Sequence, residues 1–254
     1  MAGCGHSTHY PPGFNYHEMD AFLLLNRIRH YYNWDKFALV GHSLGGALCQ
    51  LFAGTFPELV VSVAVIDIMR PFFRPVEAYP TRLRKSLESF LDWEYLLTDK
   101  EVITPVYGWD EARDRLIKAA SSLTPESADV LLSRGLRPAV KPDGTEGYVY
   151  RRDPRLKISS FLNLTTSHLE AFISRIQCPL MVIKGAQGPK YEGADVHEEA
   201  RGYFEKTLKD FRYVEVEGNH HVHLNNPERV AVPLNEFLQS VLALNEGWGT
   251  KSKL

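Results

Sequence analysis

The segment of residues 37–58, FALVGHSLGGALCQLFAGTFPE, constrains the fold of this 254-residue chain more than any other segment. It begins with a short, continuously apolar run, FALVG, which is typical of a β-strand covered on both faces. Residues 44–56 follow with helical spacing and end before a proline. Ser43 stands at the junction, two residues after Gly41 and two residues before Gly45. A serine at such a strand-to-helix turn is typical of an exposed nucleophile.

The geometry of this turn restricts the residues around Ser43. The serine must be pushed out of the turn in a strained backbone conformation. Residues 41 and 45 are both glycine, and we expect the turn to require this because larger side chains at these two positions would collide. The N–H of Leu44, at the start of the helix, is expected to be one hydrogen-bond donor for a developing oxyanion.

A second Gly-His-Ser triplet occurs at residues 5–7, within GCGHSTHYPPG. No strand can precede it, and His9 rather than a glycine stands two residues after Ser7. The triplet therefore lacks the surroundings that a nucleophile at a strand-to-helix turn needs. We expect Ser7 to be an ordinary loop serine.

The rest of the chain alternates apolar strand patterns with helical patterns. This alternation predicts a parallel, doubly wound sheet of the α/β class. The further strands are expected at residues 60–67, 179–185 and 211–218, and the further helices at residues 15–33, 198–208 and 227–242.

The alternation is interrupted between residues 70 and 164. Helices are expected at residues 111–120 and 125–133, and AVKPDGTEGYVYRRD predicts a hairpin with a Pro-Asp-Gly turn. We interpret this stretch as a mainly helical lid inserted into the α/β core. Its aromatic side chains either line an apolar substrate pocket or pack the lid itself: Phe72, Phe73, Phe90, Trp93, Tyr95, Tyr107 and Trp109.

The predicted domain organisation has three parts. Residues 1–68 form the first part of the core with Ser43, residues 69–164 form the lid, and residues 165–254 complete the core with a histidine-rich loop.

A serine nucleophile needs a base, and histidine is the usual base near neutral pH. The loop EVEGNHHVHLNNPERV follows the last predicted strand and offers His220, His221 and His223. Spacing alone does not choose among them. A zinc site would need further acidic or cysteine partners at suitable spacing, which this loop lacks, so we predict no metal and no cofactor.

The base needs a carboxylate to orient it. Asp67 ends the second apolar strand, and the carboxyl ends of parallel strands meet at one edge of a sheet. After the third strand, the nearest acids are Glu192 and Asp195. The residues themselves leave this choice open.

Composition excludes several other function classes. The formal net charge of −2 gives no sign of a nucleic-acid or anionic-membrane partner. The longest apolar run, LVVSVAVI, is too short to cross a bilayer, and the N-terminus has no secretory signal pattern. Three cysteines are too few for a disulfide framework and fit a reducing compartment. We expect the partner of the chain to be a small-molecule acyl substrate.

Over essentially its whole length, the chain resembles the α/β-hydrolase superfamily, and within it the animal serine hydrolase-like proteins. LVGHSLGGALCQLFAGTFPE is similar to the nucleophile turn of that family, and LLSRGLRPAVKPDGTEGYVYRRDPRL is similar to its lid. VEVEGNHHVHLNNPERVA is similar to its catalytic-histidine loop, in which the first histidine after Gly-x is the base. The resemblance therefore implies His220, and it implies the chain order serine, acid, histidine.

The sequence departs from the family at the acid. Many relatives carry it after the third strand named above, in a G-x-x-D pattern, but here the sequence is Gly-Ala-Gln-Gly, with Gly188 in the place of the aspartate. Some branches take the acid from the strand after the nucleophile helix, where Asp67 stands. We therefore predict Asp67, with Asp195 as the second choice.

The resemblance also bears on the N-terminus. GCGHSTHYPPG is similar to the family's loop after its fourth strand, with Ser7 as the loop serine. About four strands and a His-Gly oxyanion loop normally come before it. The chain therefore resembles a truncated hydrolase that lacks its N-terminal strands. On this view FALVG is an exposed sheet edge, and we expect the chain alone to be poorly soluble and to have little or no esterase activity.

The nucleophile narrows the reaction. Haloalkane dehalogenases and epoxide hydrolases resemble this fold but carry an aspartate at the position of the nucleophile. The serine at this position, Ser43, favours acyl transfer instead, and so a substrate that is an ester, a thioester or an amide. The leading hypothesis is a serine hydrolase with the triad Ser43, His220 and Asp67. The alternative is a catalytically inactive truncated isoform or a ligand-binding protein of the same fold.

The sequence ends in Ser252-Lys253-Leu254, a tripeptide that the peroxisomal import receptor reads at the extreme C-terminus. We therefore expect peroxisomal localisation with the import receptor as a partner, and a cytoplasmic share is also compatible.

Overall fold

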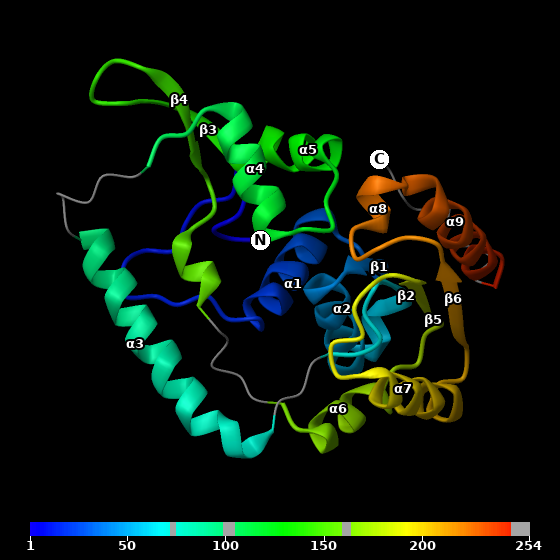
Figure 1. Cartoon of the computed structure of the whole chain (residues 1–254). Helices are drawn as coiled ribbons and strands as arrows, with labels where there is room; N and C mark the ends of the chain where they lie inside the picture. The colour runs from blue at the N-terminus through cyan, green and yellow to red at the C-terminus, as the bar shows by residue number, and fades with distance from the viewer. Residues whose placement is uncertain (72–74, 99–104, 159–163, 245–254) are drawn as a thin grey trace. The chain divides into compact units, whose positions relative to one another are not determined.

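The computed structural model describes residues 1–71, 75–98, 105–158 and 164–244 (Figure 1). The predicted lid aromatics Phe72 and Phe73, and the C-terminal residues 252–254, lie outside these ranges. The chain divides into two compact units. One contains Met1–Leu24 and Arg74–Asn163, and the other contains Leu25–Phe73 and Leu164–Leu254.

The second unit is built on a four-stranded sheet, which we call the central sheet. All neighbouring strands are parallel, and their order is β1-β2-β5-β6 (Figure 1). The strands are β1 (Phe37–His42), β2 (Val60–Ile66), β5 (Leu180–Gly185) and β6 (Phe211–Val216). The sequence prediction of a parallel α/β sheet is confirmed.

Helices cover both faces of the central sheet. Ala64 and Ile66 face one way and pack in one cluster with Phe237 of α9. Val65 faces the other way and lies next to Gly46 of α2. The helices of this unit are α2 (Leu44–Thr55), α6 (Thr166–Ile173), α7 (Ala194–Thr207), α8 (Val222–Asn225) and α9 (Pro227–Leu244), with the short 3-10 turn η1 (Pro57–Leu59).

Strand β1 differs from its prediction. Its continuous apolar run indicated cover on both faces, but only alternate residues are buried. Phe37 and Leu39 are buried, whereas Ala38 is exposed and Val40 is 47% exposed. Leu39 aligns with Val63 on the face that α2 covers, whereas Val40 aligns with Ala64 on the opposite face, where α9 contacts β2, β5 and β6. Strand β1 lies at the edge of the sheet, so α9 gives Val40 less cover than it gives Ala64. Within the described residues, β1 pairs with β2 alone and is an edge strand.

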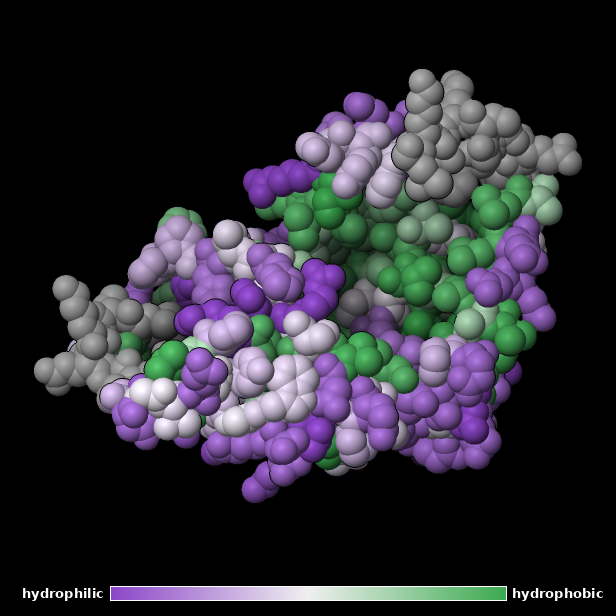
Figure 2. All heavy atoms as spheres, turned by 90° about the horizontal axis from the view of Figure 1, so that it is seen from above, coloured by the Kyte–Doolittle hydropathy of each residue, from purple (hydrophilic) through white to green (hydrophobic). Residues whose placement is uncertain are grey.

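Apolar side chains also reach the surface elsewhere. Figure 2 shows patches of hydrophobic residues among the hydrophilic ones on the face seen there. In the unit that holds the central sheet, the exposed large side chains include Tyr31, Tyr32 and Trp34. Tyr32 and Trp34 stack on one another with ring centroids 5.1 Å apart. None of the helices in the described part of the chain combines the length and apolarity needed to cross a bilayer.

The other unit contains the predicted hairpin and helices. The hairpin is confirmed as two antiparallel strands, β3 (Leu136–Val140) and β4 (Glu146–Tyr150). The helices are α3 (Tyr79–Thr98), α4 (Trp109–Ala119) and α5 (Pro125–Gly135), with 3-10 turns η2 (Val76–Ala78) and η3 (Pro154–Lys157). Helix α1 (Asp20–Tyr32) belongs partly to each unit.

Two of the aromatic side chains considered for a substrate pocket pack within this unit instead. Tyr107 and Trp109 pack against the buried cluster of Ala112, Leu132 and Leu136. The indole Nε1 of Trp109 also donates to Asp129 at 2.8 Å. The interpretation that these two side chains pack the insert fits this arrangement.

The first residues of the chain are held in the same unit by a buried ion pair. Arg155 and Asp153 are 3% and 1% exposed, and the guanidinium donates to Asp153 Oδ2 at 2.8 Å. Arg155 also donates to the carbonyl oxygens of Tyr10, Pro11 and Phe14. Residues 1–24 are thus grouped with the insert, whereas the sequence analysis grouped them with the sheet. Compact units need not coincide with domains, so the predicted division stays a prediction.

Candidate functional site

Ser43 occupies the turn between β1 and α2 in a left-handed backbone conformation, with φ 52° and ψ −121°. Residues other than glycine rarely adopt a positive φ, because it strains the backbone. The neighbouring strand helps to hold the turn, since the N–H of Ser43 donates to the carbonyl of Ile66 at 3.0 Å. The carbonyl of Ser43 accepts from the N–H of Ala47, and this hydrogen bond is the first of helix α2. The expected strained turn is therefore present.

The glycines around Ser43 do not have the roles that the spacing suggested. A Cβ on Gly41 would overlap the backbone of Gly45 and Gly46, as expected. A Cβ on Gly45, however, would have no atom of the described residues within 4 Å. The crowded position is Gly46, whose Cβ would lie 2.9 Å from the Gly41 carbonyl oxygen and from Ile68 Cγ2. The expectation for Gly45 was wrong because its backbone, and not its side-chain position, faces Gly41.

A pair of substitutions tests this assignment. Gly46→Ala is expected to lower the free energy of unfolding by about 1–3 kcal/mol, because overpacking forces its neighbours apart. Gly45→Ala is the matched control in the same helix. It should leave that free energy unchanged or raise it by up to about 1 kcal/mol, since alanine favours a helix over glycine. Urea unfolding of both variants measures the difference, and equal destabilisation would refute the assignment.

Ser43, His220 and Asp67 are brought together at the carboxyl ends of β1, β6 and β2. His220 Nε2 lies 3.0 Å from Ser43 Oγ, and His220 Nδ1 lies 2.6 Å from Asp67 Oδ2. With Nδ1 carrying its proton toward the carboxylate, Nε2 is left to accept the hydroxyl proton. The other candidate acids lie elsewhere. Asp195 is exposed in the first turn of α7, and Glu192 pairs with Arg70 at 3.0 Å.

Asp67 is fully buried and is held from several sides. Its own backbone has a left-handed φ of 51°, which aspartate tolerates better than most residues. The ammonium of Lys184 lies 2.5 Å from Oδ1, and the N–H of Gly185 donates to the same oxygen at 3.0 Å. Burial alone would raise the pKa of Asp67, but hydrogen bonds from His220 and Lys184 and the charge of Lys184 hold that pKa below its ordinary value.

Gly188, the position at which the family resemblance led us to look for an aspartate, lies directly against this carboxylate. A Cβ at residue 188 would overlap both carboxylate oxygens of Asp67. The position that an acid would occupy after β5 is therefore filled by the side chain of Asp67, which reaches it from the end of β2. This explains why residue 188 is glycine in this chain.

The rings of the loop histidines pack at tilted angles around His42, the residue before Ser43. The ring of His42 lies 4.5 Å from that of His220 and 4.0 Å from that of His223. His42 Nε2 donates to the backbone carbonyl of His220 at 2.7 Å. Burial lowers the pKa of His42 and that of His223 to about 4, so both are uncharged at neutral pH. The rings of His221 and His223 both pack against the ring of His42.

Tyr191 is a residue of the site that the sequence did not point out. Its hydroxyl lies 3.2 Å from His220 Nε2 and also interacts with the side chain of Ser43. Burial raises the pKa of Tyr191, and the negative charge of Asp67 adds to the rise. The phenol is therefore a neutral hydrogen-bond donor at neutral pH. It follows β5 in a loop without a recognisable motif, so no sequence signal marks it.

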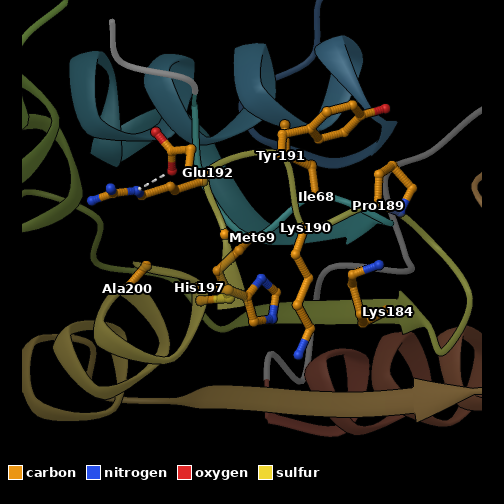
Figure 3. A pocket seen from close by; sticks show the side chains of 11 residues that line it. Ile68, Met69, Lys184, Pro189, Lys190, Tyr191, Glu192, His197 and Ala200 are labelled. Carbon is orange, nitrogen blue, oxygen red and sulfur yellow. Dashed lines mark hydrogen bonds and ion pairs between the residues drawn. The ribbon is translucent and has the colours of Figure 1, made fainter. Parts of the chain in front are cut away.

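A small recess lies next to the site in the same unit (Figure 3). Its lining includes Lys184, Tyr191 and His197, together with Ile68 and Met69 from the segment after β2. Tyr191 thus lies both at the rim of this recess and beside His220.

The remaining predicted site residues also have definite positions. Leu44 is the first residue of α2, where backbone N–H groups have no partner within the helix. Ser7 is exposed in a loop of the other unit, where its N–H donates to Cys4. In the described part of the chain, no three histidine, cysteine or acidic side chains are grouped as metal ligands would be.

This arrangement is able to perform one kind of chemistry. Ser43 Oγ can give its proton to His220 while it attacks an electrophilic carbon, and the Asp67 carboxylate can stabilise the imidazolium that forms. The N–H of Leu44 can donate to the oxyanion that develops on the carbonyl oxygen.

Known proteins with similar sequences carry related descriptions. Residues 1–227 match the family described as "alpha/beta hydrolase fold". A "Probable serine hydrolase" of Drosophila melanogaster is 35% identical over 94% of this chain and 71% of its own length. "Serine hydrolase-like protein 2" of Homo sapiens is 30% identical over 94% of this chain and 76% of its own length.

A solved structure is similar as well. The hypothetical protein PA1622 from Pseudomonas aeruginosa PAO1 superimposes with a TM-score of 0.78 at 28% identity, covering 94% of this chain and 78% of that protein.

Proposed function

Because the chain belongs to the serine hydrolase-like family of α/β-hydrolases, we propose that it is a serine hydrolase that cleaves acyl compounds through Ser43, His220 and Asp67. The observation that carries the proposal is the continuous hydrogen-bonded chain from Ser43 Oγ through His220 to Asp67. The positive φ of Ser43 adds support, because a strained strand-to-helix turn of this kind is typical of an exposed nucleophilic serine.

The reaction proceeds in two halves. Ser43 Oγ attacks the acyl carbon while its proton passes to His220 Nε2, and the N–H of Leu44 stabilises the oxyanion. His220 then returns the proton to the leaving group, which departs and leaves an acyl-serine. Water, deprotonated by the same imidazole, attacks the acyl-serine, and Ser43 is regenerated.

The substrate class follows from the nucleophile. A serine suits esters, thioesters and related acyl compounds, and a carboxylesterase-like activity on a small-molecule substrate is the proposal we make. Tyr191, beside both Ser43 and His220, is positioned to donate a hydrogen bond to such a substrate.

We also propose that the chain is imported into peroxisomes through Ser252-Lys253-Leu254. None of the described residues bears on this proposal.

A fluorophosphonate probe tests the activity, because it reacts covalently only with an activated serine. We expect the wild-type chain to be labelled, Ser43→Ala to lose all labelling, and Ser7→Ala to keep it. The alternative, an inactive or purely ligand-binding protein of this fold, requires that the wild-type chain is not labelled. Labelling of Ser43→Ala at the level of the wild type would show that the wrong serine was assigned.

A further inference from the structure

Lys184 is a buried cation at the second-to-last position of the apolar strand β5. It is 1% exposed, and its ammonium contacts Asp67 Oδ1 at 2.5 Å and the carbonyl of Gly185 at 2.9 Å. Burying a charged group costs several kcal/mol unless a partner of opposite charge and further hydrogen bonds compensate. Lys184 therefore needs Asp67 to be ionised, and the buried carboxylate needs Lys184.

The sheet itself sets this pair. Strands β2 and β5 are parallel and align Ile66 with Ile183. The residues that follow these two, Asp67 after Ile66 and Lys184 after Ile183, are therefore neighbours as well. The N–H of Asp67 extends the pairing by donating to the carbonyl of Ile183 at 2.8 Å. The contact is thus built into the register of the central sheet and does not depend on a loop.

The two carboxylate oxygens of Asp67 have different partners. Oδ1 accepts from Lys184 and Gly185, and Oδ2 accepts from His220. Rotation of the carboxylate would break the contacts on both sides. On the basis of the proposed function, we propose that Lys184 is a positioning residue, which holds the Asp67 carboxylate toward His220 and offsets part of its negative charge.

The sign of the charge effect follows from Coulomb's law in a poorly screened interior. A lone carboxylate next to an imidazole stabilises the imidazolium and makes protonation easier. A cation on the other oxygen of the same carboxylate cancels part of this stabilisation. Further titratable groups face the site from its neighbouring elements, among them His42, Arg70, Lys190, Tyr191, Glu192, His197, Tyr213, His221 and His223. All of them stay in place when Lys184 alone is replaced.

Histidine NMR titration tests the proposal without any need for activity. The ring signal of His220 is identified by its absence in His220→Ala, and the pH at the midpoint of its titration is compared among variants. Lys184→Met is expected to move that midpoint upward by about one pH unit, the lower end of the effect of a nearby charge. Lys190→Met is the matched control. It removes a lysine of the same recess whose partner is the exposed Glu198, 3.7 Å away, and it should leave the midpoint unchanged.

Lys184→Gln separates the charge from the hydrogen bond and provides the test if Lys184→Met does not fold. It removes the charge but keeps an N–H donor for Oδ1, so its midpoint should also rise by about one pH unit. The rate of fluorophosphonate labelling at pH 7 should fall about tenfold or more in Lys184→Met and less in Lys184→Gln, because glutamine still orients the carboxylate.

Two results would overturn the proposal: an unchanged midpoint in the variants of Lys184, or a midpoint that moves to lower pH. Failure of the proposed function gives a different pattern. In that case the wild-type chain is not labelled at all, while the titration of His220 still decides whether Lys184 acts on it through Asp67.

Discussion

His220→Ala is expected to abolish whatever hydrolysis of p-nitrophenyl acetate the chain performs, as Ser43→Ala does; in an enzyme with a complete triad each loss is about 10⁶-fold in kcat. The reason is that the serine is a weak nucleophile until His220 Nε2, 3.0 Å from its Oγ, accepts the proton. Two residues that act as one unit give losses that do not add. The double variant Ser43→Ala/His220→Ala should therefore be no slower than either single variant.

The neighbouring histidines provide the controls for this experiment. His221→Ala and His223→Ala should each cost much less activity than His220→Ala. The ring of His223 packs on His42, and the ring of His221 packs edge-on against His220, so both act on the base through packing alone. A loss in His221→Ala as large as that in His220→Ala would mean that the base was assigned to the wrong ring.

Asp67→Asn is expected to lower kcat by about 10⁴-fold, as removal of the orienting carboxylate does in related triads. Asparagine also tolerates the left-handed backbone of residue 67, so the fold should accept the change. An amide can present its NH₂ group to His220 Nδ1 and so favour the wrong tautomer of the imidazole. Steady-state kinetics with the same ester measure the loss.

Asp195→Asn is the control for the choice of acid. Asp195 is exposed at the start of α7, so its substitution should leave kcat within a factor of about two, as most exposed substitutions do. If Asp195→Asn is the crippling change and Asp67→Asn is mild, the acid has been misassigned.

Much of the fold follows from local patterns. The turn at Ser43 could be predicted because its strand, glycines and helix are contiguous in sequence. The hairpin β3–β4 could be predicted because a Pro-Asp-Gly turn separates its strands. Each of these inferences needs only neighbouring residues. The turn and the hairpin are both present, although the crowded glycine of the turn is Gly46 and not Gly45.

The parts of the site that come together from distant segments were harder to predict. Spacing left three histidines equivalent, and the choice of His220 came from a family resemblance. Lys184 gave no signal, because a lysine at the end of an apolar strand resembles a residue that leaves the sheet for solvent. Its partner becomes evident only when the register places Ile66 beside Ile183. Tyr191 is comparable, since only the folded loop brings its hydroxyl to His220.

The overlap between residue 188 and the carboxylate of Asp67 also limits how this site can change through evolution. A chain that gained an aspartate at 188 while keeping Asp67 would force two like-charged side chains into one volume. A chain that lost Asp67 first would keep Lys184 buried with no counter-ion and His220 with no carboxylate. Neither single step is neutral, so moving the acid between the two strand ends requires paired substitutions. We therefore expect a fitness valley between an arrangement with the acid at residue 67 and one with the acid at residue 188, and we expect the identities of these two residues to covary among relatives.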